Sequence, residues 1–93
     1  IAGREYLLDK FAESGLVTFP SHTNFVLLEC LSDNSAVRLI DSARASGYAI
    51  RGPLVGYPLE NFVRITIGPP LLMEKFWVEC NSHIFMHAKK RNS

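Results

Sequence analysis

The sequence contains no long apolar run and no excess of charge of either sign. No segment approaches the roughly 18 apolar residues that a transmembrane helix needs, so we expect no membrane partner. The formal net charge is +1, with acidic and basic residues mixed along most of the chain, and this balance favours no nucleic-acid partner. A signal-peptide pattern is also missing, and the chain begins Ile1-Ala2-Gly3 rather than with methionine. We interpret this start as that of a fragment or a processed product.

Strong catalytic motifs are missing as well. The sequence has no phosphate-cradling glycine loop, no paired-cysteine metal spacing and no nucleophile elbow. His83 and His87 stand four apart, as two metal ligands on a helix would, but no third ligand is evident and we predict no metal site. Cys30 and Cys80 fall in apolar segments. We expect both to be reduced and buried in a cytoplasmic protein rather than joined in a disulfide.

What the sequence does contain predicts one globular domain over residues 1–93. Of its 93 residues, 47% are hydrophobic and 20% are charged, which is typical of folded domains. Periodicity and turn residues predict helix, strand, helix, strand, strand and helix, in that order. The expected ranges are 2–14, 24–30, between Ser32 and Gly47, 48–51, 62–67 and from Pro70 onward, with a short extended piece at 17–20 and a turn-rich loop at 53–58. We therefore predict an α+β fold, with about three mainly antiparallel strands and helices on one face.

The last two elements have the clearest patterns. In the last strand Val63, Ile65 and Ile67 are predicted to face the core, and Phe62, Arg64 and Thr66 the other side. On the last helix an apolar stripe is expected to contain Leu72, Phe76, Cys80 and Ile84. We expect Trp77 to pack beside this stripe, and the residues from His87 to Ser93 to form a frayed, solvated tail.

Arg64 is the most informative candidate for a functional residue. An arginine in the middle of a strand offers a fixed planar fork, which suits a carboxylate or phosphate held by two parallel hydrogen bonds. Arg51, at the end of the neighbouring strand, is placed to reach the same region. The alternative interpretation is that both are surface charges of an open sheet face. Asn24, at the start of the central strand, either contacts a ligand or satisfies a turn.

Several segments together resemble the C-terminal part of fold-type I aminotransferases, particularly the histidinol-phosphate branch. They are Arg4-Glu5-Tyr6-Leu7, Pro20 to Leu27, Gly47 to Arg51, Leu59 with Phe62 to Gly68, and Pro69 to Phe76. Their order and separations are more specific than any one of them, and they cover roughly residues 3 to 79. In that family the arginine equivalent to Arg64 holds the substrate α-carboxylate. The equivalent of Arg51 is implicated in binding the phosphate end of histidinol phosphate or its partner, and Asn24 matches a position near the site entrance.

The resemblance implies that the chain is a small domain whose partner is a large domain of the same polypeptide. In such enzymes the large domain holds pyridoxal phosphate, and the full-length protein is usually a homodimer. No lysine here matches the Schiff-base motif, so we expect no catalytic or cofactor-binding residue in the chain and no transamination by it alone. The implied substrates are an amino acid and a phosphorylated amino alcohol, interconverted in amino-acid biosynthesis.

The sequence is also compatible with two other functions. One is the same domain in another member of the superfamily, such as a threonine-phosphate decarboxylase, which would keep Arg64 and change the partners of Arg51. The other is a standalone α+β module that binds an amino acid, or regulates, without catalysis. An RNA-binding sheet is disfavoured, because the last strand offers Phe62 with Arg64 and Thr66 rather than stacked aromatics flanked by basic residues.

Overall fold

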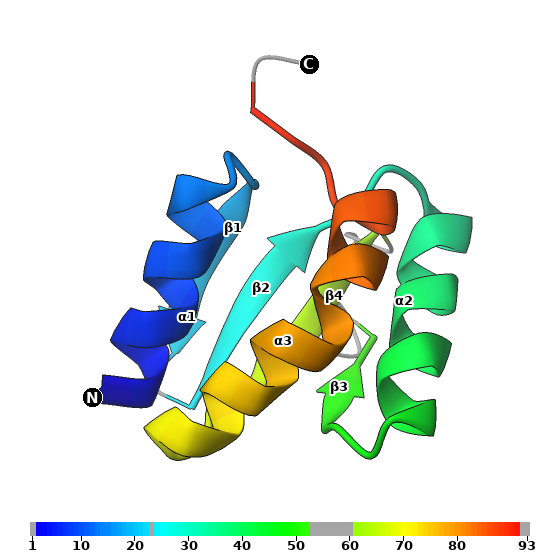
Figure 1. Cartoon of the computed structure of the whole chain (residues 1–93). Coiled ribbons are helices and arrows are strands. Elements are labelled where there is room, and N and C mark those ends of the chain that lie inside the picture. Colours follow the sequence, from blue (N-terminus) through cyan, green and yellow to red (C-terminus); the bar gives the residue numbers. More distant parts are fainter. Residues whose placement is uncertain (1, 23, 53–60, 92–93) are drawn as a thin grey trace.

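The computed structural model describes residues 2–22, 24–52 and 61–91, and within them three helices pack on one face of a four-stranded sheet (Figure 1). The turn-rich loop expected at 53–58 lies outside the described residues. The elements are α1 (Ala2–Glu13), β1 (Thr18–His22), β2 (Phe25–Glu29), α2 (Asp33–Ala45), β3 (Ile50–Arg51), β4 (Phe62–Thr66) and α3 (Pro70–His87). The α+β prediction is confirmed.

The sheet is antiparallel throughout, in the order β1-β2-β4-β3. It has one strand more than the expected three, because the short extended piece pairs with β2 as an edge strand. Pro20 is compatible with this position, since an edge strand leaves one row of N–H groups without a partner strand. The register between β1 and β2 shifts between Phe19 and His22, close to the proline.

Helix ends follow the local signals in the sequence. The side chain of Ser32 accepts a hydrogen bond from the Ser35 N–H at the start of α2. Gly15 and Gly47 follow α1 and α2 with φ of 71° and 90°, a conformation that glycine adopts without a steric penalty. Pro70 opens α3 at a position where the missing N–H removes no helical hydrogen bond.

The core lies between the sheet and the helices. It consists of alternate residues of the strands and of residues on the inner sides of the helices. Its largest fully buried side chains include those of Leu7, Phe11, Leu28, Leu39, Ile65, Phe76 and Ile84. On α3 the expected stripe is correct for Phe76, Cys80 and Ile84. Leu72 is instead 44% exposed, and Met73 occupies the core at that turn. Trp77 packs against this core, as predicted, and its ring meets the Phe11 ring edge-on with a centroid distance of 5.8 Å.

The prediction of a frayed tail from His87 onward is wrong for residues 87–91. His87 is a buried residue of α3, and Ala88 and Lys90 form bridges with Cys30 and Leu16. The backbone N–H of Lys89 donates to the Glu29 carbonyl at 2.8 Å, and the N–H of Arg91 donates to the Gly15 carbonyl at 2.7 Å. These residues therefore lie at one end of the sheet, beside the segment before β1 and the end of β2, held by main-chain hydrogen bonds whose partners are distant in sequence.

Candidate functional site

The sheet face away from the helices brings the two predicted arginines together. Arg51 of β3 and Arg64 of β4 are directly opposed Cα partners, and Arg64 is also the partner of Leu27 in β2. Leu27 in turn opposes Phe19 in β1, so these four residues form one row across all four strands. We call it the arginine row. Their strand neighbours Val26, Ile50 and Ile65 belong to the buried core on the helix side, which fixes the row on the opposite face.

The electrostatics of the arginine row favour an anion. Directly opposed partners have Cβ atoms about 4.5–5.5 Å apart, and like charges at that separation destabilise a sheet. Within the described part of the chain, no carboxylate forms an ion pair with Arg51 or Arg64. Glu29 lies on the same face of β2, but its carboxylate contacts the Lys89 ammonium at 3.3 Å and the Asn61 amide at 3.4 Å. A bound anion would relieve the repulsion between the two guanidinium groups.

The two arginines differ in how firmly they are held. Arg64 is half-buried on an inner strand, and its guanidinium carbon lies 5.7 Å from the centroid of the Phe25 ring. This cation–π contact limits the orientations of the guanidinium. Arg51 is exposed on the edge strand. The row therefore presents two guanidinium groups: that of Arg64 is held in one orientation, and that of Arg51 can adapt. Such a pair suits a ligand with two acceptor groups, or with one large acceptor group.

Phe25 was not singled out from the sequence as a site residue. It lies two residues before Leu27, on the same face of β2, and opposes Thr66. Strand alternation places Phe25 on the same face as Leu27, the residue that opposes Arg64, and two residues away from it along β2. This diagonal relationship was the only signal for a contact between Phe25 and Arg64. That signal requires the pairing register, which the sequence did not supply.

Asn24 does not join the arginine row. It lies three positions before Leu27, which corresponds to about 10 Å along a strand. Its carbonyl accepts a hydrogen bond of 2.8 Å from the Ile67 N–H, so its backbone closes this end of the β2–β4 pairing. This bond belongs to the strand pairing, so both the turn interpretation of Asn24 and a contact with ligand stay predictions.

Other reactive side chains lie elsewhere. Cys30 and Cys80 are free and buried, as predicted. Burial, helped by the charge of Glu29, raises the pKa of the Cys30 thiol to about 12, and burial also raises the pKa of Cys80. Neither is suited to act as a nucleophile, because the thiolate is the reactive form. In the described ranges, no group of three or more His, Cys, Asp or Glu residues is placed to hold a metal ion, and no helix is long and apolar enough to cross a membrane.

The lysines do not fit an anchor for pyridoxal phosphate beside the arginine row. Lys10 belongs to α1, where it contacts Glu13, and Lys75 is exposed on α3. Lys89 pairs with Glu29, and Lys90 bridges to the segment after α1. A cofactor held covalently would need a lysine next to the substrate, and none of the four lysines lies there.

Comparison with known proteins finds one informative similarity. Histidinol-phosphate aminotransferase 2 of Pasteurella multocida (strain Pm70) is 34% identical to the chain over 79 residues. The chain resembles a region of an aminotransferase. The match includes 85% of this chain and 21% of the relative, so the chain spans about a fifth of the relative's length. No family model matches the chain, and no solved structure matches it.

Proposed function

We propose that the chain is the substrate-recognition part of a pyridoxal-phosphate-dependent aminotransferase of the histidinol-phosphate type. The observation that carries this proposal is the cross-strand pair of Arg51 and Arg64 on the sheet face away from the helices. The similarity to a histidinol-phosphate aminotransferase supports it, because that similarity spans both strands of the pair. In the proposal, pyridoxal phosphate is held by a large domain outside these residues and supplies the electron sink of the reaction.

Each arginine has its own role in the proposal. Arg64, oriented by Phe25, holds the α-carboxylate of the amino acid or of 2-oxoglutarate through two parallel hydrogen bonds. Arg51, on the edge strand, holds the phosphate of histidinol phosphate. The row thus recognises both halves of the reaction, since each substrate carries an anionic group. The full enzyme would be a homodimer in the cytoplasm.

The test is a nuclear magnetic resonance titration of the chain with L-histidinol phosphate and, separately, with 2-oxoglutarate. We expect saturable shifts of backbone amides in β3 and β4. Arg64→Gln should weaken 2-oxoglutarate binding at least tenfold, because a charge-assisted hydrogen bond contributes about 1.5–3 kcal/mol. Arg51→Gln should weaken histidinol phosphate more than 2-oxoglutarate.

Arg44→Gln provides the matched control. Arg44 is exposed in the last turn of α2, away from the row, and its loss removes the same charge. If the control weakened both ligands as much as Arg64→Gln does, binding would reflect general electrostatic attraction. The proposal would also fail if neither ligand shifted amides of β3 and β4.

A further inference from the structure

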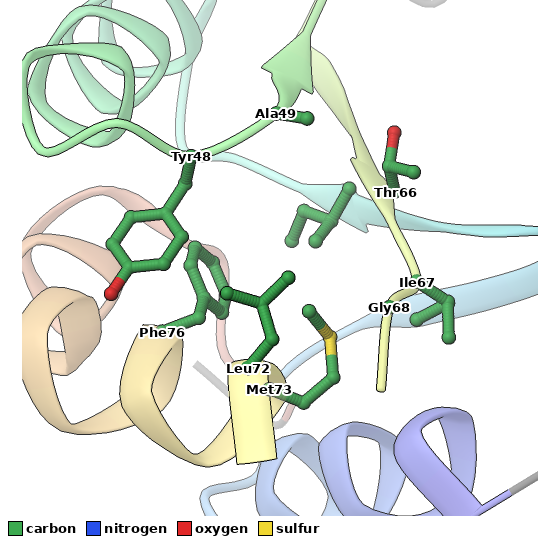
Figure 2. A pocket seen from close by; sticks show the side chains of 9 residues that line it. Tyr48, Ala49, Thr66, Ile67, Gly68, Leu72, Met73 and Phe76 are labelled. Atoms are coloured by element: carbon green, nitrogen blue, oxygen red, sulfur yellow. The ribbon is translucent and has the colours of Figure 1, made fainter. Parts of the chain in front are cut away.

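A small apolar pocket opens on the other side of the sheet, between the ends of β3 and β4 and the first half of α3 (Figure 2). Its volume is about 80 Å³. It is lined by nine residues, none of them charged: Tyr48, Ala49, Ile65, Thr66, Ile67, Gly68, Leu72, Met73 and Phe76. The pocket is separate from the arginine row, because Ile65 and Phe76 belong to the core on the helix side of the sheet.

The pocket offers a ligand few polar contacts. In Figure 2 the hydroxyl groups of Tyr48 and Thr66 both point away from the cluster formed by Leu72, Met73 and Phe76. The Tyr48 hydroxyl donates to the Glu79 carboxylate at 2.9 Å and is therefore already bonded. Most of the lining surface is apolar, so a bound hydrocarbon group would bury apolar surface on both sides of the contact. The lining therefore favours a hydrocarbon group over water or an ion.

Room for a ligand depends on the missing side chain of Gly68 and on two wall side chains that can adapt, those of Leu72 and Met73. A Cβ added to Gly68 would lie 2.9 Å from the Leu72 Cδ2 atom and 3.7 Å from the Met73 Cε atom. A side chain at position 68 would therefore press on these two walls. Leu72 is 44% exposed at the mouth, and the thioether of Met73 adapts readily to an irregular shape.

We propose that this pocket binds a small neutral molecule through one phenyl or branched aliphatic group. The size supports this class of ligand. The space is several times the 10–15 Å³ that a single water needs, and it is far below the roughly 300–1,000 Å³ of sites for larger ligands. Because no lining residue is charged, the pocket does not require an ionised ligand. The proposal is independent of the function assigned to the arginine row.

The experiment uses benzene as the probe, titrated into the whole chain and followed by amide and methyl resonances. We expect saturable shifts confined to the lining residues, with a Kd on the order of 1 mM. Acetate, a small charged molecule, is the control. At the same concentrations it should leave the resonances of the lining residues unchanged. Shifts spread over the molecule without saturation would overturn the proposal, and so would tighter binding of acetate at the lining residues.

A pair of variants tests the location. Gly68→Leu adds a side chain against the pocket walls Leu72 and Met73, whose nearest atoms would lie 2.9 and 3.7 Å from its Cβ, and should weaken benzene binding at least tenfold. Gly52→Leu makes the same change at a glycine outside the pocket, where a Cβ would meet only the Ile40 Cδ1 atom at 3.9 Å, and should alter the affinity less than twofold. If the two variants bound benzene with equal affinity, benzene would bind outside the pocket and the proposal would be wrong. Unchanged binding of 2-oxoglutarate by Gly68→Leu would show that this result is separate from the arginine row.

Discussion

Gly3 of α1 packs directly against the carbonyl oxygen of Gly68, at the connection between β4 and α3. A Cβ on Gly3 would overlap that oxygen, which belongs to the backbone and has no rotamer to change. The contact brings the start of the first helix against the start of the last one. A residue in the second position of α1 thus limits how closely the helix layer approaches the end of the sheet.

Gly3→Ala should therefore destabilise the fold, because either α1 or the β4–α3 connection must move. We expect a loss of about 1–3 kcal/mol in the free energy of unfolding, as for overpacked sites. Urea denaturation followed by circular dichroism measures it. Gly52→Ala is the control, since its Cβ would meet only the Ile40 Cδ1 atom at 3.9 Å and should change stability by less than about 1 kcal/mol. Equal losses in both variants would contradict the steric explanation.

Phe25→Leu should weaken anion binding without abolishing it. The substitution removes the ring over which the Arg64 guanidinium lies and keeps an apolar side chain on β2. A cation–π contact of about 0.5–1 kcal/mol predicts a two- to fivefold rise in the Kd for 2-oxoglutarate in the titration described above. Phe19→Leu makes the same change on the same face, where the ring contacts Phe62 instead. If both variants weakened binding equally, orientation of Arg64 by Phe25 would not be the cause.

The stability of the domain should fall as the pH falls from 7.5 to 5.5. Burial lowers the pKa of His87, and the charges of Arg38 on α2 and His83 on α3 lower it further. Below the ordinary histidine pKa of 6.5, the unfolded chain binds a proton at this residue that the folded chain resists. The stabilisation is thus complete above 6.5 and is lost as the pH drops toward the lower folded value. Urea denaturation at a series of pH values measures the slope.

His87→Gln should flatten that slope between pH 7.5 and 5.5, because it removes the buried titrating group. His83→Gln should keep most of it, since burial of His87 is the main cause of the shift. A slope that survives His87→Gln unchanged would assign the pH dependence to other groups.

Removing residues 88–93 should cost roughly 2–4 kcal/mol of unfolding free energy. The tail contributes at least three main-chain hydrogen bonds, which join Val17 to Lys89, Lys89 to Glu29 and Arg91 to Gly15. Each contributes about 0.5–1.5 kcal/mol, and Ala88 adds buried surface. Thermal and urea unfolding of the truncated chain test this. Lys89→Ala removes only the ion pair with Glu29 and should cost at most about 1 kcal/mol. A truncated chain as stable as the intact one would mean that the tail bonds contribute nothing net.

Sequence reasoning succeeded where a local pattern and burial agree. The alternation of Val63 and Ile65 with Arg64 placed the arginine on the correct face, and the expectation that Arg51 ends the neighbouring strand agrees with the observed pair. The ends of α1 and α2 followed from Gly15, Ser32 and Gly47. These features depend on a few neighbouring residues, so the sequence is sufficient to predict them.

It failed where the outcome depends on partners distant in the chain. The segment from Ala88 to Arg91 has no period of its own, and its conformation comes from the backbones of Leu16, Glu29 and Cys30. Helical spacing alone could not choose between Leu72 and Met73 for the core, because that choice depends on where β4 meets α3. The contact between Phe25 and Arg64 required the β2–β4 register. None of these relationships is encoded in a short window of sequence.

The sheet order also determines what a ribosome-bound chain exposes. β1 can pair with β2 as soon as both have been synthesised, but the other edge of β2 is completed by β4, after α2 and β3 have been added. Until then the strand Phe25–Glu29, three of whose five residues are aliphatic, has one row of main-chain groups without a partner. Such an edge is a template for pairing with other chains. Aggregation of incomplete chains should therefore stop once residues 62–66 have emerged, which makes β4 the strand that both completes the arginine row and protects the nascent domain.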